Sequence, residues 1–289
     1  MLRKLALVPI TLALAVQPSM AADKPPISLA KISNWEINYD KEACHLLAKF
    51  GTGKEETMIR LTRYQPGTNF DLTLIGKPFN TENPVINVEL GYGLAPPRKQ
   101  QAVAGTTANG QPMLILNTQR LDGWTFRAAG TAAPFVTPER EAQVTMIDLK
   151  LWNKKRYQLQ TGSMAAPMQA MRACTADLVK SWGYDPIQLA SLNQPPAPTT
   201  NPGTWLRTDD YPSSAVAQGR NGIVQFRLDV AADGSVAGCH VLYRTNPDEF
   251  ADLTCKLLNK RAKFKPALDE NGAPVRSFFI SKVRWMIPS

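Results

Sequence analysis

The residues best suited to chemistry in this chain are two cysteine–histidine pairs. Both histidines, His45 and His240, directly follow a cysteine. Thiolates and imidazoles are common zinc ligands, so Cys239, His240 and Cys255 could supply three of them. Two arguments oppose this reading. Neighbours in a strand point to opposite faces, and zinc ligands usually come in pairs two to four residues apart. We therefore predict no metal and no cofactor.

Disulfide formation is the better use of the four cysteines. An even cysteine count in an exported protein indicates two disulfides, with three connectivities open. Pairing within each half of the chain is the simplest of these, namely Cys44–Cys174 and Cys239–Cys255. Free thiols remain the third alternative, after the disulfides and the metal.

The expectation of export comes from the first 21 residues. Arg3 and Lys4 precede a twelve-residue apolar run, Leu5–Val16, and Ser19-Met20-Ala21 fits a small-x-small cleavage site. This order is typical of a secretory signal peptide, which we assign to residues 1–21. The alternative is a retained membrane anchor, although a membrane span needs about twenty apolar residues.

Patterns that would indicate catalysis are weak. Neither histidine stands beside a serine-nucleophile motif, which needs a base oriented by an acid. Gly51-Thr52-Gly53-Lys54 lacks the first glycine and the hydroxyl residue of a phosphate loop, so a hairpin turn is expected there. The adjacent carboxylates Glu55-Glu56 and Asp209-Asp210 are typical of solvated turns. We predict no catalytic residue, no small-molecule substrate and no enzyme activity.

The net charge of +9 does not indicate a nucleic-acid binder, because the basic excess is spread over both halves. Five basic residues gather between Lys256 and Lys265. They could meet lipid headgroups, but a solvated helix end is the more ordinary reading. Membrane contact therefore stays open.

A proline-rich segment divides the chain. Residues 193–204 hold four prolines and no large apolar side chain, which predicts a semi-rigid linker spanning at most ~35 Å. It separates an expected domain at 23–192 from another at 205–289. Cys44, Leu46, Ala48 and Phe50 alternate onto one strand face in the first domain. We predict a helix at Pro167–Trp182 and, for residues 139–152, a helix at the start and a strand near Val144–Leu151. The candidate strands are Trp35–Tyr39, Cys44–Phe50, Thr57–Tyr64, Phe70–Ile75, Val85–Leu90, Met113–Asn117 and Trp124–Arg127.

The second domain has a clearer pattern. Apolar residues alternate from Val224 to Val230, and Asp233-Gly234 then supplies a hairpin turn into Val236–Tyr243. A helix is expected to begin at Asn246-Pro247. The last strand is expected over Val275–Met286, with a short helix near Pro212–Gln218 leading the domain. The whole chain is therefore predicted to be α+β.

Four segments in this order resemble the C-terminal domain of TonB family proteins of Gram-negative envelopes. They are Tyr211-Pro212, the strand from Gly222 to Val230 with Asp233-Gly234-Ser235-Val236, Phe264-Lys265-Pro266-Ala267, and Gly272-Ala273-Pro274-Val275. The resemblance covers about residues 205–287 and leaves residues 23–192 unrecognised. It implies two helices on a three-stranded antiparallel sheet, a periplasmic or inner-membrane location, and protein binding without bond chemistry.

The resemblance also implies a binding strand. In such domains the last strand pairs with a short segment of an outer-membrane receptor, and chain order places it at a sheet edge, which can accept an extended peptide. We assign this role to Arg276, Ser277, Phe278, Phe279, Ile280, Ser281 and Lys282, with Phe278 and Ile280 as anchors. The alternative is an edge that its basic residues protect against aggregation.

Two readings of function follow. The first is a soluble periplasmic protein that binds a protein or peptide partner and is linked to outer-membrane transport. The second is a membrane-anchored energy transducer for receptor-mediated transport. The leader looks removable and the linker is short, and both features disfavour transduction. An enzyme in the first domain is a third class that no motif supports.

Overall fold

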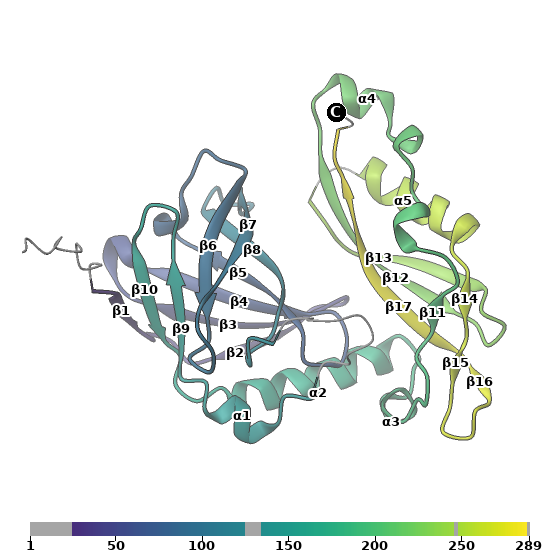
Figure 1. Ribbon diagram of the computed structural model, residues 1–289, viewed down its shortest axis with the longest axis horizontal. Helices are drawn as coiled ribbons and strands as arrows, with labels where there is room; N and C mark the ends of the chain where they lie inside the picture. The colour runs from purple at the N-terminus through teal and green to yellow at the C-terminus, as the bar shows by residue number, and fades with distance from the viewer. Residues whose placement is uncertain (1–24, 125–133, 246–247, 288–289) are drawn as a thin grey trace, which may run out of the picture.

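The computed structural model describes residues 25–124, 134–245 and 248–287. The expected signal peptide, the end of the candidate strand Trp124–Arg127 and the expected helix start at Asn246-Pro247 lie outside these ranges. The described chain forms an N-terminal strand-rich body and a C-terminal sheet covered by a helix (Figure 1). The fold is α+β, as predicted.

Ten strands of the N-terminal body form one sheet in the order β1-β10-β9-β6-β7-β8-β5-β4-β3-β2. Neighbouring strands are antiparallel except for β1 and β10. Lys31, just after β1, also bridges Phe50 at the end of β3, and the Gly51 amide donates to the Ala30 carbonyl at 2.9 Å. The sheet therefore closes on itself. Its strands are β1 (Ile27–Ala30), β2 (Glu36–Tyr39), β3 (Cys44–Phe50), β4 (Thr57–Arg63), β5 (Phe70–Ile75), β6 (Val85–Gly91), β7 (Arg98–Thr106), β8 (Pro112–Gln119), β9 (Met146–Lys150) and β10 (Arg156–Gln160).

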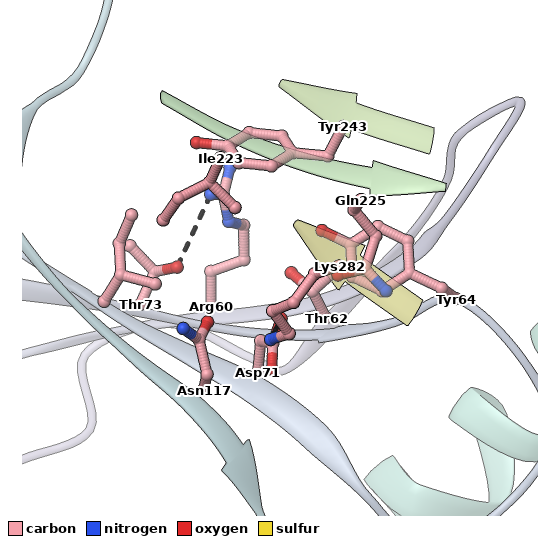
Figure 2. A pocket seen from close by; sticks show the side chains of 11 residues that line it. Arg60, Thr62, Tyr64, Asp71, Thr73, Asn117, Ile223, Gln225, Tyr243 and Lys282 are labelled. Carbon is pink, nitrogen blue, oxygen red and sulfur yellow. Dashed lines mark hydrogen bonds and ion pairs between the residues drawn. The ribbon is translucent and has the colours of Figure 1, made fainter. Parts of the chain in front are cut away.

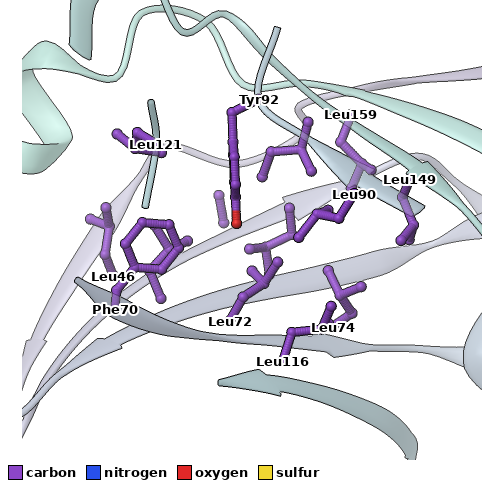
Figure 3. Packing of buried hydrophobic residues seen from close by; sticks show 14 of the residues in the cluster. Leu46, Phe70, Leu72, Leu74, Leu90, Tyr92, Leu116, Leu121, Leu149 and Leu159 are labelled. Atoms are coloured by element: carbon purple, nitrogen blue, oxygen red, sulfur yellow. The ribbon is translucent and has the colours of Figure 1, made fainter. Parts of the chain in front are cut away.

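The inside of this closed sheet is packed with apolar side chains, mainly leucines. Leu46, Leu72 and Leu74 are essentially unexposed, and Phe70 contacts Tyr92 edge to face with ring centroids 5.9 Å apart (Figure 3). The predicted alternation of β3 is confirmed, since every second residue from Cys44 to Phe50 is buried. The 3-10 turn η1 (Gly53–Glu55) lies in the loop between β3 and β4, where a hairpin turn was expected. A second 3-10 turn, η2 (Lys77–Phe79), follows β5.

Helix α2 (Ala165–Ser181) packs on β2 and β3, and its buried side chains join the core of the sheet. The Cys44–Cys174 disulfide joins it to β3, as predicted. Residues 139–152 also behave as expected, with α1 (Pro138–Ala142) followed by β9. Arg172 of α2 donates at 2.7 Å to Glu141 of α1, which is buried. A buried carboxylate needs such a partner, so this ion pair fixes the two helices together.

The end of α2 is set by a glycine. Gly183 has a φ of +80°, the left-handed conformation that glycine adopts without steric cost. Its amide donates to the Lys180 carbonyl, and the Tyr184 amide donates to the Val179 carbonyl. This pair of bonds is the Schellman motif. It aims Tyr184 away from the helix axis, toward the C-terminal sheet. The short helix α3 (Pro186–Ala190) follows, with Asp185 as its N-cap.

The proline-rich segment is not a free spacer, and our prediction of a semi-rigid linker is wrong in this respect. Strand β11 (Ala197–Pro198) pairs with β14 (Phe264–Lys265), Gln194 bridges Leu268, and the Thr199 amide donates to the Lys263 carbonyl at 2.9 Å. The prolines keep this segment extended, so it can add to the C-terminal domain as an edge ribbon.

The C-terminal sheet has the order β13-β12-β17 and is antiparallel throughout. Phe250 and Leu258 of α5 are buried against it, beside Trp205 and Phe226. The Cys239–Cys255 disulfide joins β13 to α5, as predicted. The elements of this part are the 3-10 turns η3 (Pro202–Thr204) and η4 (Thr208–Asp210), α4 (Ser213–Ala217), β12 (Gly222–Val230), β13 (Val236–Arg244), α5 (Asp248–Arg261), β15 (Ala267–Leu268), β16 (Pro274–Val275) and β17 (Ser277–Trp285). Within the described ranges, no helix combines the length and the apolar character needed to cross a membrane.

Candidate functional site

Strand β17 lies at the edge of the C-terminal sheet. It pairs with β12 over nine residues, from Val230 opposite Ser277 to Gly222 opposite Trp285. In the part of the chain that the structure describes, β17 pairs with no second strand. The predicted binding residues 276–282 therefore fall on this strand and on Arg276, which separates it from β16.

The two faces of β17 have different surroundings. Phe279 and Val283 pack toward α5, and the Trp285 ring stacks on Phe250 at 5.3 Å while its indole nitrogen donates to Thr254 at 3.0 Å. This is the alternation that the sequence predicts. The opposite face carries Phe278, Ile280 and Lys282, and it faces the N-terminal body.

The two predicted anchor side chains both contact the N-terminal body; Phe278 is buried and Ile280 is half-buried. Phe278 is only 9% exposed and contacts Trp182 and Tyr184 edge to face, with ring centroids at 5.6 and 5.1 Å. Ile280 packs against the same cluster, which also contains Val179 and Leu189. The residues after α2 therefore cover this face of β17. We call Trp182, Tyr184 and Leu189 the cover.

A polar network surrounds the apolar part of this contact. The Tyr184 hydroxyl lies 2.8 Å from the Asp229 carboxylate and 3.0 Å from the Ser277 carbonyl, so it shares its single proton between two acceptors. Burial, followed by the hydrogen bond to Asp229, raises the pKa of Tyr184 above its ordinary value. Asp229 also accepts from Arg227 at 3.1 Å and lies 2.9 Å from the ring of His240.

Two cations stack on the aromatic rings of the cover. The Arg227 guanidinium lies 4.0 Å from the centre of the Trp182 ring, and the Arg276 guanidinium lies 4.3 Å from that of Tyr184. Such contacts are worth about 0.5–2 kcal/mol, and more as they lose water. Arg276 was assigned to partner binding from sequence; here it contacts the cover.

A second contact lies farther along β17. Lys282 forms an ion pair of 3.5 Å with Asp71 of β5, whose other oxygen accepts the Thr118 amide at 2.8 Å. A cavity of about 30 Å³ lies beside this pair, enough for one water molecule. Figure 2 shows its walls facing each other across the two bodies. They include Arg60, Tyr64 and Asp71 on one side and Gln225, Tyr243 and Lys282 on the other.

The residues considered for other chemistry are used structurally. The metal alternative loses two of its ligands, because Cys239 and Cys255 are bonded to each other. His45 lies 2.9 Å from the Thr62 hydroxyl, and burial lowers its pKa. Over the described ranges, no three His, Cys, Asp or Glu side chains are grouped so that they could hold a metal ion.

Sequence reasoning missed Tyr184 and Asp71 as neighbours of β17. Neither lies in a motif, and each reaches β17 only through the arrangement of the two bodies. One signal was available for Tyr184, because an aromatic residue directly after a helix-ending glycine often makes the apolar contact of a Schellman motif. Asp71 carried no such signal.

The comparisons with known proteins agree with this geometry. Residues 208–287 match the family described as "Gram-negative bacterial TonB protein C-terminal". Residues 208–287 are a TonB C-terminal domain. Proteins of the TonB family are non-enzymatic components of envelope transport. The match does not extend to the N-terminal body, and neither a curated protein nor a solved structure matches the chain.

Proposed function

We propose that this protein is a non-enzymatic component of envelope transport whose TonB C-terminal domain binds an extended segment of an outer-membrane receptor. The segment would add as a new strand to β17, along residues 276–282. One observation carries the proposal: β17 is an edge strand whose described partner is β12 alone. Main-chain groups on the other edge of such a strand can bond an incoming peptide.

We also propose a periplasmic location. The expected leader favours export, and the two disulfides of the structure suit an oxidising compartment. The alternative is a membrane-anchored transducer. It would need a spacer between the membrane and the binding domain, and residues 193–204 cannot serve as one while they are paired with β14 and Leu268. N-terminal sequencing of the mature protein separates the two, since a start near Ala22 supports export and a start at Met1 supports the anchor.

Proline substitution along β17 tests the proposed strand pairing. Successive amides of an edge strand point alternately toward the neighbouring strand and toward solvent. Of the two residues Ile280 and Ser281, one therefore has an amide that points to solvent and the other has an amide that points to β12. Proline at the first position removes only the outward donor, whereas proline at the second breaks a hydrogen bond to β12. We expect the proline variant that keeps the wild-type melting temperature to bind at least about 10-fold more weakly. Binding is measured by fluorescence anisotropy with synthetic peptides of N-terminal receptor segments.

Ile280→Ala and Ser281→Ala are the controls, because each removes the side chain and keeps the amide. Both should bind within about 3-fold of wild type. If each proline variant folds and keeps wild-type affinity for every peptide that the wild type binds, strand addition to β17 is not the binding mode.

A further inference from the structure

The N-terminal body contacts the face of β17 that carries Phe278, Ile280 and Lys282 at two places. At one end Trp182, Tyr184 and Leu189 pack on Phe278 and Ile280. At the other end Asp71 meets Lys282. We propose that these contacts form an intramolecular gate, which an incoming strand must displace before it pairs with β17. This inference rests on the proposed function and adds a regulatory step to it.

Sheet geometry explains why the gate and the partner compete. A strand added to β17 lies about 4.8 Å from it, and every second side chain of that strand falls on the face that carries Phe278, Ile280 and Lys282. On that face Trp182 and Tyr184 already contact the Phe278 ring, and the Asp71 carboxylate already pairs with Lys282. Partner side chains that contact Phe278 or Lys282 must therefore compete with these groups of the N-terminal body.

The contact has features of an interface that opens. Its apolar part is small, with Val179, Tyr184 and Phe278 as its buried members. Two buried polar atoms in it, Nη1 of Arg227 and Nε1 of Trp182, have no hydrogen-bond partner among the described residues. A buried polar group left unsatisfied destabilises the closed state. When the N-terminal body moves away from β17, both atoms can bond water. The free energy gained in this way offsets part of the free energy lost with the apolar contact.

The gate also indicates what the partner should carry. Tyr184 supplies an aromatic ring to Phe278, and Asp71 supplies a carboxylate to Lys282. Phe278 and Lys282 are four residues apart on one face of the strand, so cross-strand neighbours of the two are also four residues apart. The partner that best replaces the gate is therefore an extended segment with an aromatic and an acidic side chain at that spacing.

The variant Tyr184→Phe, which lacks only the hydroxyl oxygen, weakens the gate and so tests it. It removes the donor to Asp229 and Ser277 and keeps the ring. We expect the β17 amides to exchange with deuterium about 10-fold faster in the full chain, because a hydrogen bond to a charged group is lost from the closed state only. Asp71→Asn, which can still accept the Thr118 amide, should raise exchange at the Lys282 end about 3-fold.

The matched control is Tyr157→Phe. Tyr157 is a buried tyrosine of β10 that donates to Glu55 at 2.7 Å, and it is not part of the apolar cluster at the gate. It should leave deuterium exchange at β17 unchanged.

The binding probe is a nine-residue peptide of alternating threonine and valine with a tyrosine and an aspartate four positions apart, made in both orders. Because coupling is reciprocal, Tyr184→Phe should bind this probe about 10-fold more tightly than wild type.

The readouts separate the gate from the proposed function. If exchange at β17 is the same in wild type, Tyr184→Phe and Asp71→Asn, there is no gate. If exchange rises in the variants but neither the probe nor any receptor peptide binds them, the gate stands and strand addition by a partner is rejected. Equal acceleration in Tyr157→Phe would assign the effect to global destabilisation and would also overturn the gate.

Discussion

Replacing Cys44 and Cys174 together by alanine should lower the free energy of unfolding of the N-terminal body by roughly 5 kcal/mol. The disulfide joins residues 130 apart in sequence, and in the chain-entropy model the cost of closing a loop grows with its length. Both cysteines are fully buried, so alanine leaves no unsatisfied polar atom behind. Urea unfolding followed by tryptophan fluorescence measures the loss. Since domains are commonly stable by about 5–15 kcal/mol, the variant should be close to unfolding.

The second disulfide gives the comparison. Cys239 and Cys255 are 16 residues apart, so their alanine double variant should lose roughly 3 kcal/mol, in the C-terminal domain. The order of the two losses is the test. Equal losses, or a larger loss for the short loop, would show that restriction of the unfolded chain is not the main source of stability here.

The long-range disulfide also bears on the gate. Cys174 lies in α2, eight residues before the C-cap Trp182, which is about 12 Å along the helix axis. The bond therefore fixes α2 to β3 at a point two turns from the cover. In the alanine double variant, the cover should hold Phe278 less firmly, and deuterium exchange at β17 should rise along with the loss of stability.

Sequence patterns predicted best those elements that bury one apolar face. The apolar residues of strand β3, strand β12 and helix α2 recur with the period of their element and mark the face toward the core, although Gln225 and Arg227 on the other face of β12 are also buried. Strand β7 was missed. Its sequence, Arg98–Thr106, is mostly polar and its burial is shallow, so neighbouring strands rather than its own composition make it a strand. Strands β1 and β10 were also missed.

The candidate site shows the limit of local reasoning more clearly. The position of β17 at the edge followed from chain order, and its two faces followed from alternation. The cover over Phe278 did not follow, because it depends on how Tyr184 and Asp71 of one body meet the other. The proline-rich segment misled us for a related reason: prolines favour an extended chain, but they do not say whether that chain is solvated or paired with an edge such as β14.

Gly234→Ala should destabilise the C-terminal domain by at least about 3 kcal/mol. Gly234 ends the hairpin turn between β12 and β13 with a φ of +82°, and a Cβ atom there would come within 2.1 Å of the Phe264 carbonyl oxygen. The Phe264 amide donates to the Gly234 carbonyl at 3.1 Å, so the two segments touch at main-chain level on both sides. Neither can retreat alone, because Phe264 is buried against Trp205 and Phe279.

Gly272→Ala measures the cost of the backbone conformation alone, without a steric clash. Gly272 has nearly the same φ, +79°, and a Cβ atom there meets nothing within 4 Å. This variant should lose only about 1–2 kcal/mol, the cost of a left-handed alanine. Urea unfolding of both variants gives the difference, which measures how tightly the hairpin packs on Phe264. A difference near zero would mean that the segment around Phe264 moves aside freely. The close contact between Gly234 and Phe264 would then not be what holds β14 beside the sheet.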